Sequence, residues 1–180
     1  FTSAAIRSAV SDCLVQAGAN LADWSAKEEL KQGDDVNVDV LVVGGGPGGL
    51  YAAWISALRG HQVTLLEKGE ELGGNFRVAS FPTGKGQLSE AIRSLIVKCQ
   101  KAGVELRTGA EATEESLKAL APEAIILATG STPLVLPIPG LADCGYVTAQ
   151  DMLEGKAPMG RKVLVVGGGM VGCEAAEYLA

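Results

Sequence analysis

Short apolar runs alternate with amphipathic stretches along most of the chain. Three of these runs, at 40–43, 63–66 and 124–128, are continuous and rich in Val, Ile and Leu. Runs of this composition are typical of parallel strands that are buried on both faces. Between them, apolar residues recur at helical spacing. The pattern therefore predicts an α/β fold, in which a parallel sheet is flanked by helices.

The predicted elements follow one another in the order of a βαβ fold. They are a strand at 40–43, a helix over 50–58, a strand at 63–66, a helix over 88–99, a short strand at 104–106, a helix over 113–120 with Thr113 as N-cap, a strand at 124–128 and a short helix over 148–153. The Gly-rich segment 70–86 is predicted to be irregular. Three prolines between 133 and 139 predict an extended connector, and the first crossover should be right-handed.

One strand-and-glycine segment occurs twice. The sequence Val-Leu-Val-Val-Gly-Gly-Gly stands at 40–46 and again at 163–169, and each copy is followed by a helical pattern. We therefore expect three regions. They are an N-terminal extension or linker over 1–35, a dinucleotide-binding domain over 36–157, and over 158–180 the start of a second, truncated nucleotide-binding unit.

Composition and charge exclude several function classes. Net charge is −6 and aromatic residues make up 4% of the 180 residues, so nucleic acid and anionic membranes are poor partners. The stretch 38–58 is apolar but holds Asp39 and five glycines, which favours a strand, turn and helix over a membrane span. No signal peptide is visible, so we expect a reducing, cytoplasmic location.

The four cysteines are scattered and the single histidine stands in a turn. No Cys-x-x-Cys pair exists among Cys13, Cys99, Cys144 and Cys173, which excludes a zinc ribbon and a short-spaced redox dithiol. His61 is interpreted as a solvated turn residue. We therefore expect no metal site and no catalytic side chain.

The glycines after the first strand form a dinucleotide-binding motif. In the pattern Gly44-x-Gly46-x-x-Gly49, the first Gly permits a tight turn, the second lets a pyrophosphate approach the backbone, and the third lets helix and strand pack closely. Glu67 ends the next strand, where a carboxylate accepts ribose hydroxyls, which favours FAD or NAD over a 2′-phosphate. The alternative is a turn of structural use only.

Two further segments carry weaker signals. Ala128-Thr129-Gly130 follows a buried strand and suits a turn against a flavin or its diphosphate, although a simple strand exit has the same composition. The second motif, with Gly167 and Gly169, indicates either a second nucleotide site or a packed strand and helix without a ligand.

Several segments together resemble one group of flavoproteins. These are Arg59-Gly60-His61-Gln62-Val63-Thr64-Leu65-Leu66-Glu67-Lys68, Glu71-Leu72-Gly73-Gly74-Asn75, Pro82, Lys85, Ala128-Thr129-Gly130, Pro137-Ile138-Pro139-Gly140 and Val166-Gly167-Gly168-Gly169-Met170-Val171-Gly172-Cys173-Glu174. The group is the multidomain NADH:flavin oxidoreductases of the 2,4-dienoyl-CoA reductase and trimethylamine dehydrogenase type. The resemblance covers 36–180. It implies a Rossmann-like, glutathione-reductase-like FAD/NAD(P)-binding domain behind an old-yellow-enzyme barrel that carries FMN.

The resemblance also implies cofactor-binding roles for individual residues. The residues that match the family's FAD or ADP site are Gly44, Gly46, Pro47, Gly48, Gly49, Glu67, Lys68, Gly74, Asn75, Ala112, Ala128, Thr129 and Gly130. Asn75 replaces the family's Gln, and the backbone of Ala112 matches a position that faces adenine. The second motif, with Gly167 and Gly169, would bind NAD(P)H. Cys13 resembles the last ligand of an iron–sulfur cluster, and the competing interpretation is a cysteine on a helix face.

Three functions are compatible with these residues. The first is a flavin domain that binds FAD and passes electrons from NAD(P)H to FMN or an iron–sulfur centre in a barrel domain or partner subunit. In that arrangement the small-molecule substrate meets the barrel and not this part. The second is a non-catalytic module that binds ADP or FAD. The third, a nicotinamide dehydrogenase that uses only the first motif, is disfavoured because it lacks a proton donor.

Overall fold

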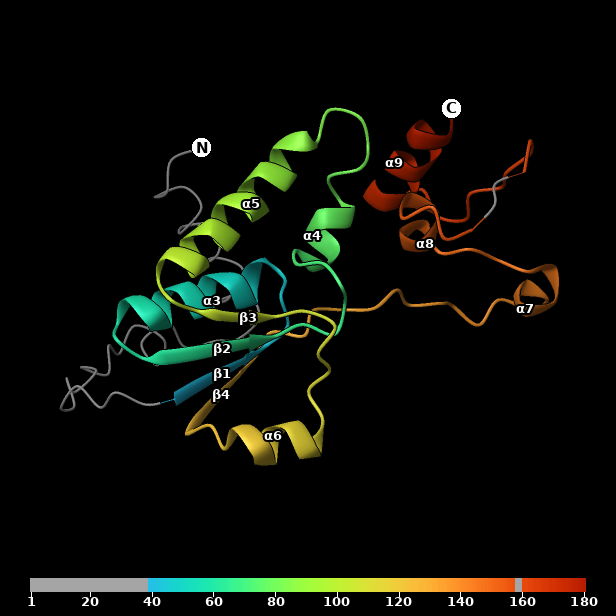
Figure 1. Ribbon diagram of the computed structural model, residues 1–180. Coiled ribbons are helices and arrows are strands. Elements are labelled where there is room, and N and C mark those ends of the chain that lie inside the picture. The colour runs from blue at the N-terminus through green and yellow to red at the C-terminus, as the bar shows by residue number, and fades with distance from the viewer. Residues whose placement is uncertain (1–38, 158–159) are drawn as a thin grey trace, which may run out of the picture. The chain divides into compact units, whose positions relative to one another are not determined.

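The computed structural model describes residues 39–157 and 160–180 (Figure 1). These residues belong to one compact unit, Asn37–Ala180. The sequence-based hypotheses about Cys13 and the extension over 1–35 lie outside the described residues. The boundaries expected at 35/36 and 157/158 stay predictions.

A four-stranded parallel sheet forms the centre of the fold. Its strands are β1 (Asp39–Val43), β2 (Gln62–Leu66), β3 (Glu105–Arg107) and β4 (Ala124–Leu127), in the order β3-β2-β1-β4. Val43 pairs with Leu66 on one side and with Leu127 on the other. Three strands therefore reach the same edge together, and the predicted α/β fold with a parallel sheet is confirmed.

Two helices cover one face of the sheet and enclose the core. Figure 1 shows α3 (Pro47–Leu58) and α5 (Gly86–Lys101) together on this face, with α6 (Glu114–Leu120) on the other. The buried core consists of Val40, Val42, Leu50, Ala53, Val63, Leu65, Ile92, Cys99 and Val104. These residues come from the strand runs and from the apolar helix faces that the sequence pattern predicts.

The helix boundaries follow local capping signals. Thr113 caps α6 as predicted, since its hydroxyl oxygen accepts the backbone N–H of Ser116 at 3.2 Å. Helix α8 (Ala149–Leu153) and helix α9 (Met170–Leu179) were also expected. Two short helices were not, namely α4 (Gly74–Val78) and α7 (Leu141–Cys144). Helix α4 begins after Gly73 in a left-handed conformation, φ 115°, inside the segment predicted to be irregular.

Charged side chains link α4 and the residue before α5 to the residues around α8 and α9. Arg77 on α4 donates to Glu154 Oε1 at 2.9 Å, and Lys156 Nζ lies 2.6 Å from the other oxygen of that carboxylate. Lys85, just before α5, pairs with Glu174 on α9. No helix within 39–157 and 160–180 is long and apolar enough to cross a membrane.

The prediction of a strand at 163–166 is wrong. The structure gives these residues no strand, and Leu164 and Val166 are 87% and 67% exposed. A strand is held by ladder hydrogen bonds to a neighbour. No described segment pairs with 163–166. Its apolar composition alone is therefore not enough to form a strand.

The glycine turn that follows nevertheless repeats the first turn. Gly167 has φ 115° where Gly44 has φ 108°. A Cβ on Gly172 would lie 1.9 Å from the Gly167 oxygen, as a Cβ on Gly49 would lie 1.8 Å from the Gly44 oxygen. The turn and the helix start are therefore determined by the glycine spacing and do not require a paired strand.

Replacing Gly49 by Ala should destabilise the fold, because the new methyl group would overlap the Gly44 carbonyl oxygen. Overpacking of this kind costs about 1–3 kcal/mol, so we expect Tm in thermal circular dichroism to fall by about 5 °C. Gly48→Ala is the matched control, since Gly48 lies in the same helix with nothing within 4 Å of its Cβ position. An unchanged Tm for G49A would contradict the packing role.

The Cys99 thiol should resist alkylation in the native protein. Cys99 is fully buried and donates to the Leu50 carbonyl at 3.1 Å, and burial raises the pKa of its thiol. Thiolates are the reactive form, so Cys99 should react with iodoacetamide only after unfolding. The exposed Cys144 and Cys173 should react first. Peptide mass spectrometry measures the order, and equal native labelling of Cys99 would contradict it.

Candidate nucleotide-binding site

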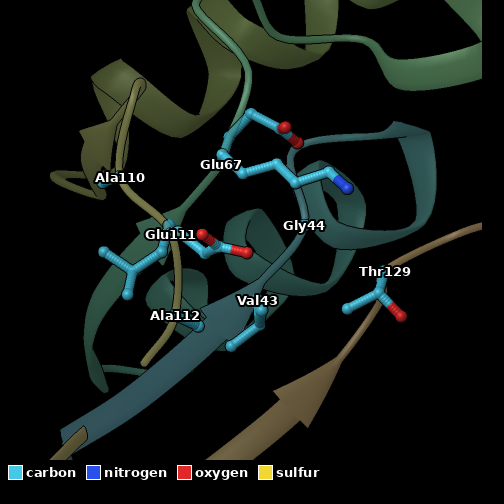
Figure 2. Close-up of a pocket in the computed structure, with 9 residues that line it drawn as sticks. Val43, Gly44, Glu67, Ala110, Glu111, Ala112 and Thr129 are labelled. Atoms are coloured by element: carbon cyan, nitrogen blue, oxygen red, sulfur yellow. The ribbon is translucent and has the colours of Figure 1, made fainter. Parts of the chain in front are cut away.

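A pocket of about 210 Å³ opens at the edge where the strands end (Figure 2). The residues that line it are Val43, Gly44, Leu66, Glu67, Lys68, Ala110, Glu111, Ala112 and Thr129. They come from the ends of β1 and β2, from the segment after β3 and from the residues after β4. In Figure 2 Gly44 lies between Glu111 and Thr129, which agrees with the strand order.

The turn after β1 is held by backbone contacts on both sides. Gly44 N donates to the Leu66 oxygen at 2.8 Å, and Ala128 N donates to the Val43 oxygen at 2.8 Å. A Cβ on Gly44 would lie 2.2 Å from the Ala128 oxygen, so only glycine fits here. Ala128 was predicted to bind the cofactor. It does not line the pocket, and its backbone packs against the glycine turn.

Gly46 and the start of α3 leave open backbone at this turn. Nothing lies within 4 Å of a Cβ on Gly46, and no side chain caps the helix, which begins with Pro47. The first N–H groups of a helix have no partner inside it and favour an anion. This open backbone therefore fits a diphosphate, which is the group the glycine pattern predicts.

The Glu67 carboxylate is held in place by backbone donors. Gly45 N donates to Oε2 at 2.7 Å, and Gly69 N donates to Oε1 at 2.8 Å. The carboxylate is half-buried and lines the pocket. Each carboxylate oxygen has a second lone pair. Both oxygens can therefore accept a further hydrogen bond from a ribose hydroxyl.

The other predicted site residues divide between the pocket and its surroundings. Lys68, Ala112 and Thr129 line it together with Glu67. Ala110 and Glu111 line it as well and were not predicted. The only sequence feature that points to them is that they precede Ala112. The family resemblance at Ala112 concerns the backbone, so it indicates no role for neighbouring side chains.

Other predicted site residues do not line this pocket, namely Gly46, Pro47, Gly48, Gly49, Gly74, Asn75 and Gly130. A Cβ on Gly74 would lie 3.4 Å from Gly46 Cα, which places α4 close to the glycine turn. The amide of Asn75 donates to the Ser131 carbonyl oxygen at 2.9 Å and to its hydroxyl at 3.3 Å. Asn75 therefore connects α4 to the segment that follows β4, and Gly130 with φ 69° lies beside that contact.

Gly167 and Gly169 also do not line the pocket in Figure 2. Gly169 has open space at its Cβ position, as Gly46 does. Within the described residues 160–180, this second turn is followed by α9 and by no strand. Their role with a nucleotide stays a prediction.

Comparisons with known proteins agree with this fold. The model of the family described as pyridine nucleotide-disulphide oxidoreductase matches residues 38–180. The NADH oxidase of Thermoanaerobacter brockii is 44% identical over 156 residues, which are 84% of this chain and 24% of that protein. The cinnamate reductase of Clostridium sporogenes is 39% identical over 150 residues, 83% of this chain and 22% of that protein.

A solved structure shows the same fold. The 2-naphthoyl-CoA reductase in complex with 2-naphthoyl-CoA superposes with a TM-score of 0.75 at 38% identity, over 80% of this chain and 22% of that chain. The chain thus spans about a quarter of the length of these relatives. It belongs to the pyridine nucleotide-disulphide oxidoreductase family, as the FAD/NAD(P)-binding part of the multidomain NADH:flavin oxidoreductases.

Proposed function

We propose that the pocket beside the first glycine turn holds the ADP half of FAD, and that this part of the enzyme passes electrons from NAD(P)H to another redox centre. One observation carries the proposal. The fixed carboxylate of Glu67 lines the pocket, and the open helix start at Gly46 directly follows Gly45, whose N–H donates to that carboxylate. A diphosphate and a ribose need these two groups within one nucleotide's length of each other.

Each predicted site residue then has a defined role in binding the cofactor. The open backbone at Gly46 receives the diphosphate, with Pro47 and Gly48 in the first turn of the helix, while Gly44 makes the turn and Gly49 lets the helix pack against it. Glu67 accepts the ribose hydroxyls with Lys68 beside it, and the backbone of Ala112 meets the adenine. Thr129 lines the pocket, and Gly74, Asn75 and Gly130 would hold the part of the cofactor outside it.

Bound FAD would supply the redox chemistry, as acceptor of a hydride from NAD(P)H and donor of electrons to a further centre. The chain's residues need only bind and orient the nucleotides, so no side chain is proposed as nucleophile or proton donor. Gly167 and Gly169 belong to the site for NAD(P)H. The receiving centre, FMN or an iron–sulfur cluster, lies in a barrel domain or partner subunit, where the substrate also binds.

A second function is a module that binds ADP or FAD without redox turnover. The residues that line the pocket favour it, because they account for the ADP half, which ADP and FAD share. The two functions differ in whether the flavin ring is recognised.

Calorimetric titration of the 180-residue chain with ADP and with FAD separates these two functions. A redox flavin domain should bind FAD at least about tenfold more tightly than ADP, because the ring adds contacts beyond the shared ADP half, and 1.4 kcal/mol of contacts is tenfold. Equal affinities would favour the non-redox module. Reduction of bound FAD by NADH, seen as loss of its yellow colour, provides the second readout.

Glu67→Gln should weaken ADP binding by about tenfold or more, because hydrogen bonds to a charged group contribute about 1.5–3 kcal/mol. The NH₂ group of the new Gln would also face the Gly45 N–H or the Gly69 N–H, which places two hydrogen-bond donors against each other. Glu123→Gln is the control, since Glu123 stands exposed before β4, at the other end of that strand from the pocket. Unchanged ADP affinity in E67Q, with circular dichroism showing a folded protein, would contradict the ribose role.

A further inference from the structure

We propose that Glu111 makes the first nucleotide pocket reject an adenosine that carries a 2′-phosphate, by offsetting the positive charge of Lys68. This inference rests on the proposed function, because it concerns the ribose end of the ADP site. It assigns a role in specificity to Glu111, a side chain that belongs to none of the sequence motifs.

Three charged side chains line the pocket, namely Glu67, Lys68 and Glu111. Glu67 is bound by two backbone N–H groups. Lys68 and Glu111 form no ion pair with any residue in the part of the chain that the structure describes. Both charges therefore act on whatever enters the pocket.

Lys68 by itself would favour the wrong nucleotide. It directly follows the acid that accepts the ribose hydroxyls, and a cation near that ribose is the feature that accommodates a 2′-phosphate. The charges of Glu67 and Lys68 are opposite and equal, so the net charge at the ribose depends on a further acidic group. Glu111 is the acidic side chain that lines the same pocket from another segment.

The position of Glu111 is fixed by backbone pairing. Ala110 N donates to the Glu67 oxygen at 2.9 Å, and Gly109 N donates to the Gly69 oxygen at 2.9 Å. These two bonds join the segment after β3 to the residues after β2. Figure 2 shows the Glu111 carboxylate directed from this segment toward Gly44. The carboxylate thus stands over the pocket and not away from it.

The size of the effect follows from Coulomb's law. Across a pocket of this volume, two unit charges are about 8 Å apart, which corresponds to a change in affinity of about 2-fold at the dielectric constant of water and about 30-fold at an effective value of 20. Glu111 is exposed, so we expect about three- to tenfold. A phosphate monoester carries more than one negative charge, so the change in affinity should lie toward the upper end of the three- to tenfold range.

Such selectivity has a use in an enzyme that also meets NAD(P)H. The second motif is proposed to bind a nicotinamide dinucleotide, and NADPH carries a 2′-phosphate on its adenosine. A first pocket that rejects this phosphate keeps the electron donor from displacing FAD.

Calorimetry on the 180-residue chain tests the proposal with ADP and 2′-phospho-ADP as probes. The measured quantity is the ratio of the two dissociation constants in wild type, E111Q, K68Q and E123Q. Wild type should prefer ADP by more than about tenfold, since Glu67 and Glu111 both oppose the added charge. E111Q should reduce this preference by about three- to tenfold, and K68Q should increase it. Raising the salt concentration should diminish both shifts.

Glu123→Gln removes the same charge outside the pocket and should leave the ratio unchanged. An unchanged ratio in E111Q, or an equal shift in E123Q, would overturn the role of Glu111 while leaving the ADP site intact. Equal binding of both probes to wild type would overturn it as well. If wild type binds neither probe, the proposed function itself fails, which is a different result from a failure of selectivity.

Discussion

The fold depends on one close approach of backbone to backbone. Gly44 sits against the Ala128 carbonyl on one side and Gly49 on the other, at distances that exclude any Cβ. This contact brings the start of α3 directly over the edge of the sheet. Because β1, β2 and β4 end together there, the same contact places the open backbone of Gly46 within reach of the Glu67 carboxylate. The nucleotide pocket is a consequence of this packing.

The parts of the fold that sequence predicted well are governed by local chemistry. The Gly44 turn and the Thr113 cap each depend on residues a few positions apart, and the runs at 40–43 and 63–66 form β1 and β2. The run at 124–128 forms β4 but is not buried as predicted, because β4 is an edge strand in which Ile125 and Leu127 are exposed. Helix α4 was missed because its first residues are glycines, which are unfavourable inside helices. Here Gly73 and Gly74 adopt positive φ, and contacts with α5 and Gly46 outweigh the low helix propensity.

The remaining differences come from long-range pairing. The segment 163–166 repeats the residues of β1 but has no neighbouring strand within the described ranges, whereas the turn after it adopts the first turn's geometry. Identical residues therefore give the same turn in both places but a strand only in the first. Glu111 was overlooked for a related reason. Its place at the pocket is set by hydrogen bonds from Gly109 and Ala110 to residues about forty positions earlier, which no local pattern reveals.

The hydrogen bonds of Glu67 also affect how a ligand would be received. A glutamate side chain free in solvent loses rotamer freedom worth up to about 2 kcal/mol when it is ordered. In this protein Gly45 and Gly69 order that side chain during folding, before any ligand arrives. A ribose would thus meet a rigid acceptor, and association would need no rearrangement of this carboxylate. The folding reaction, and not the binding reaction, bears the entropic cost of recognition.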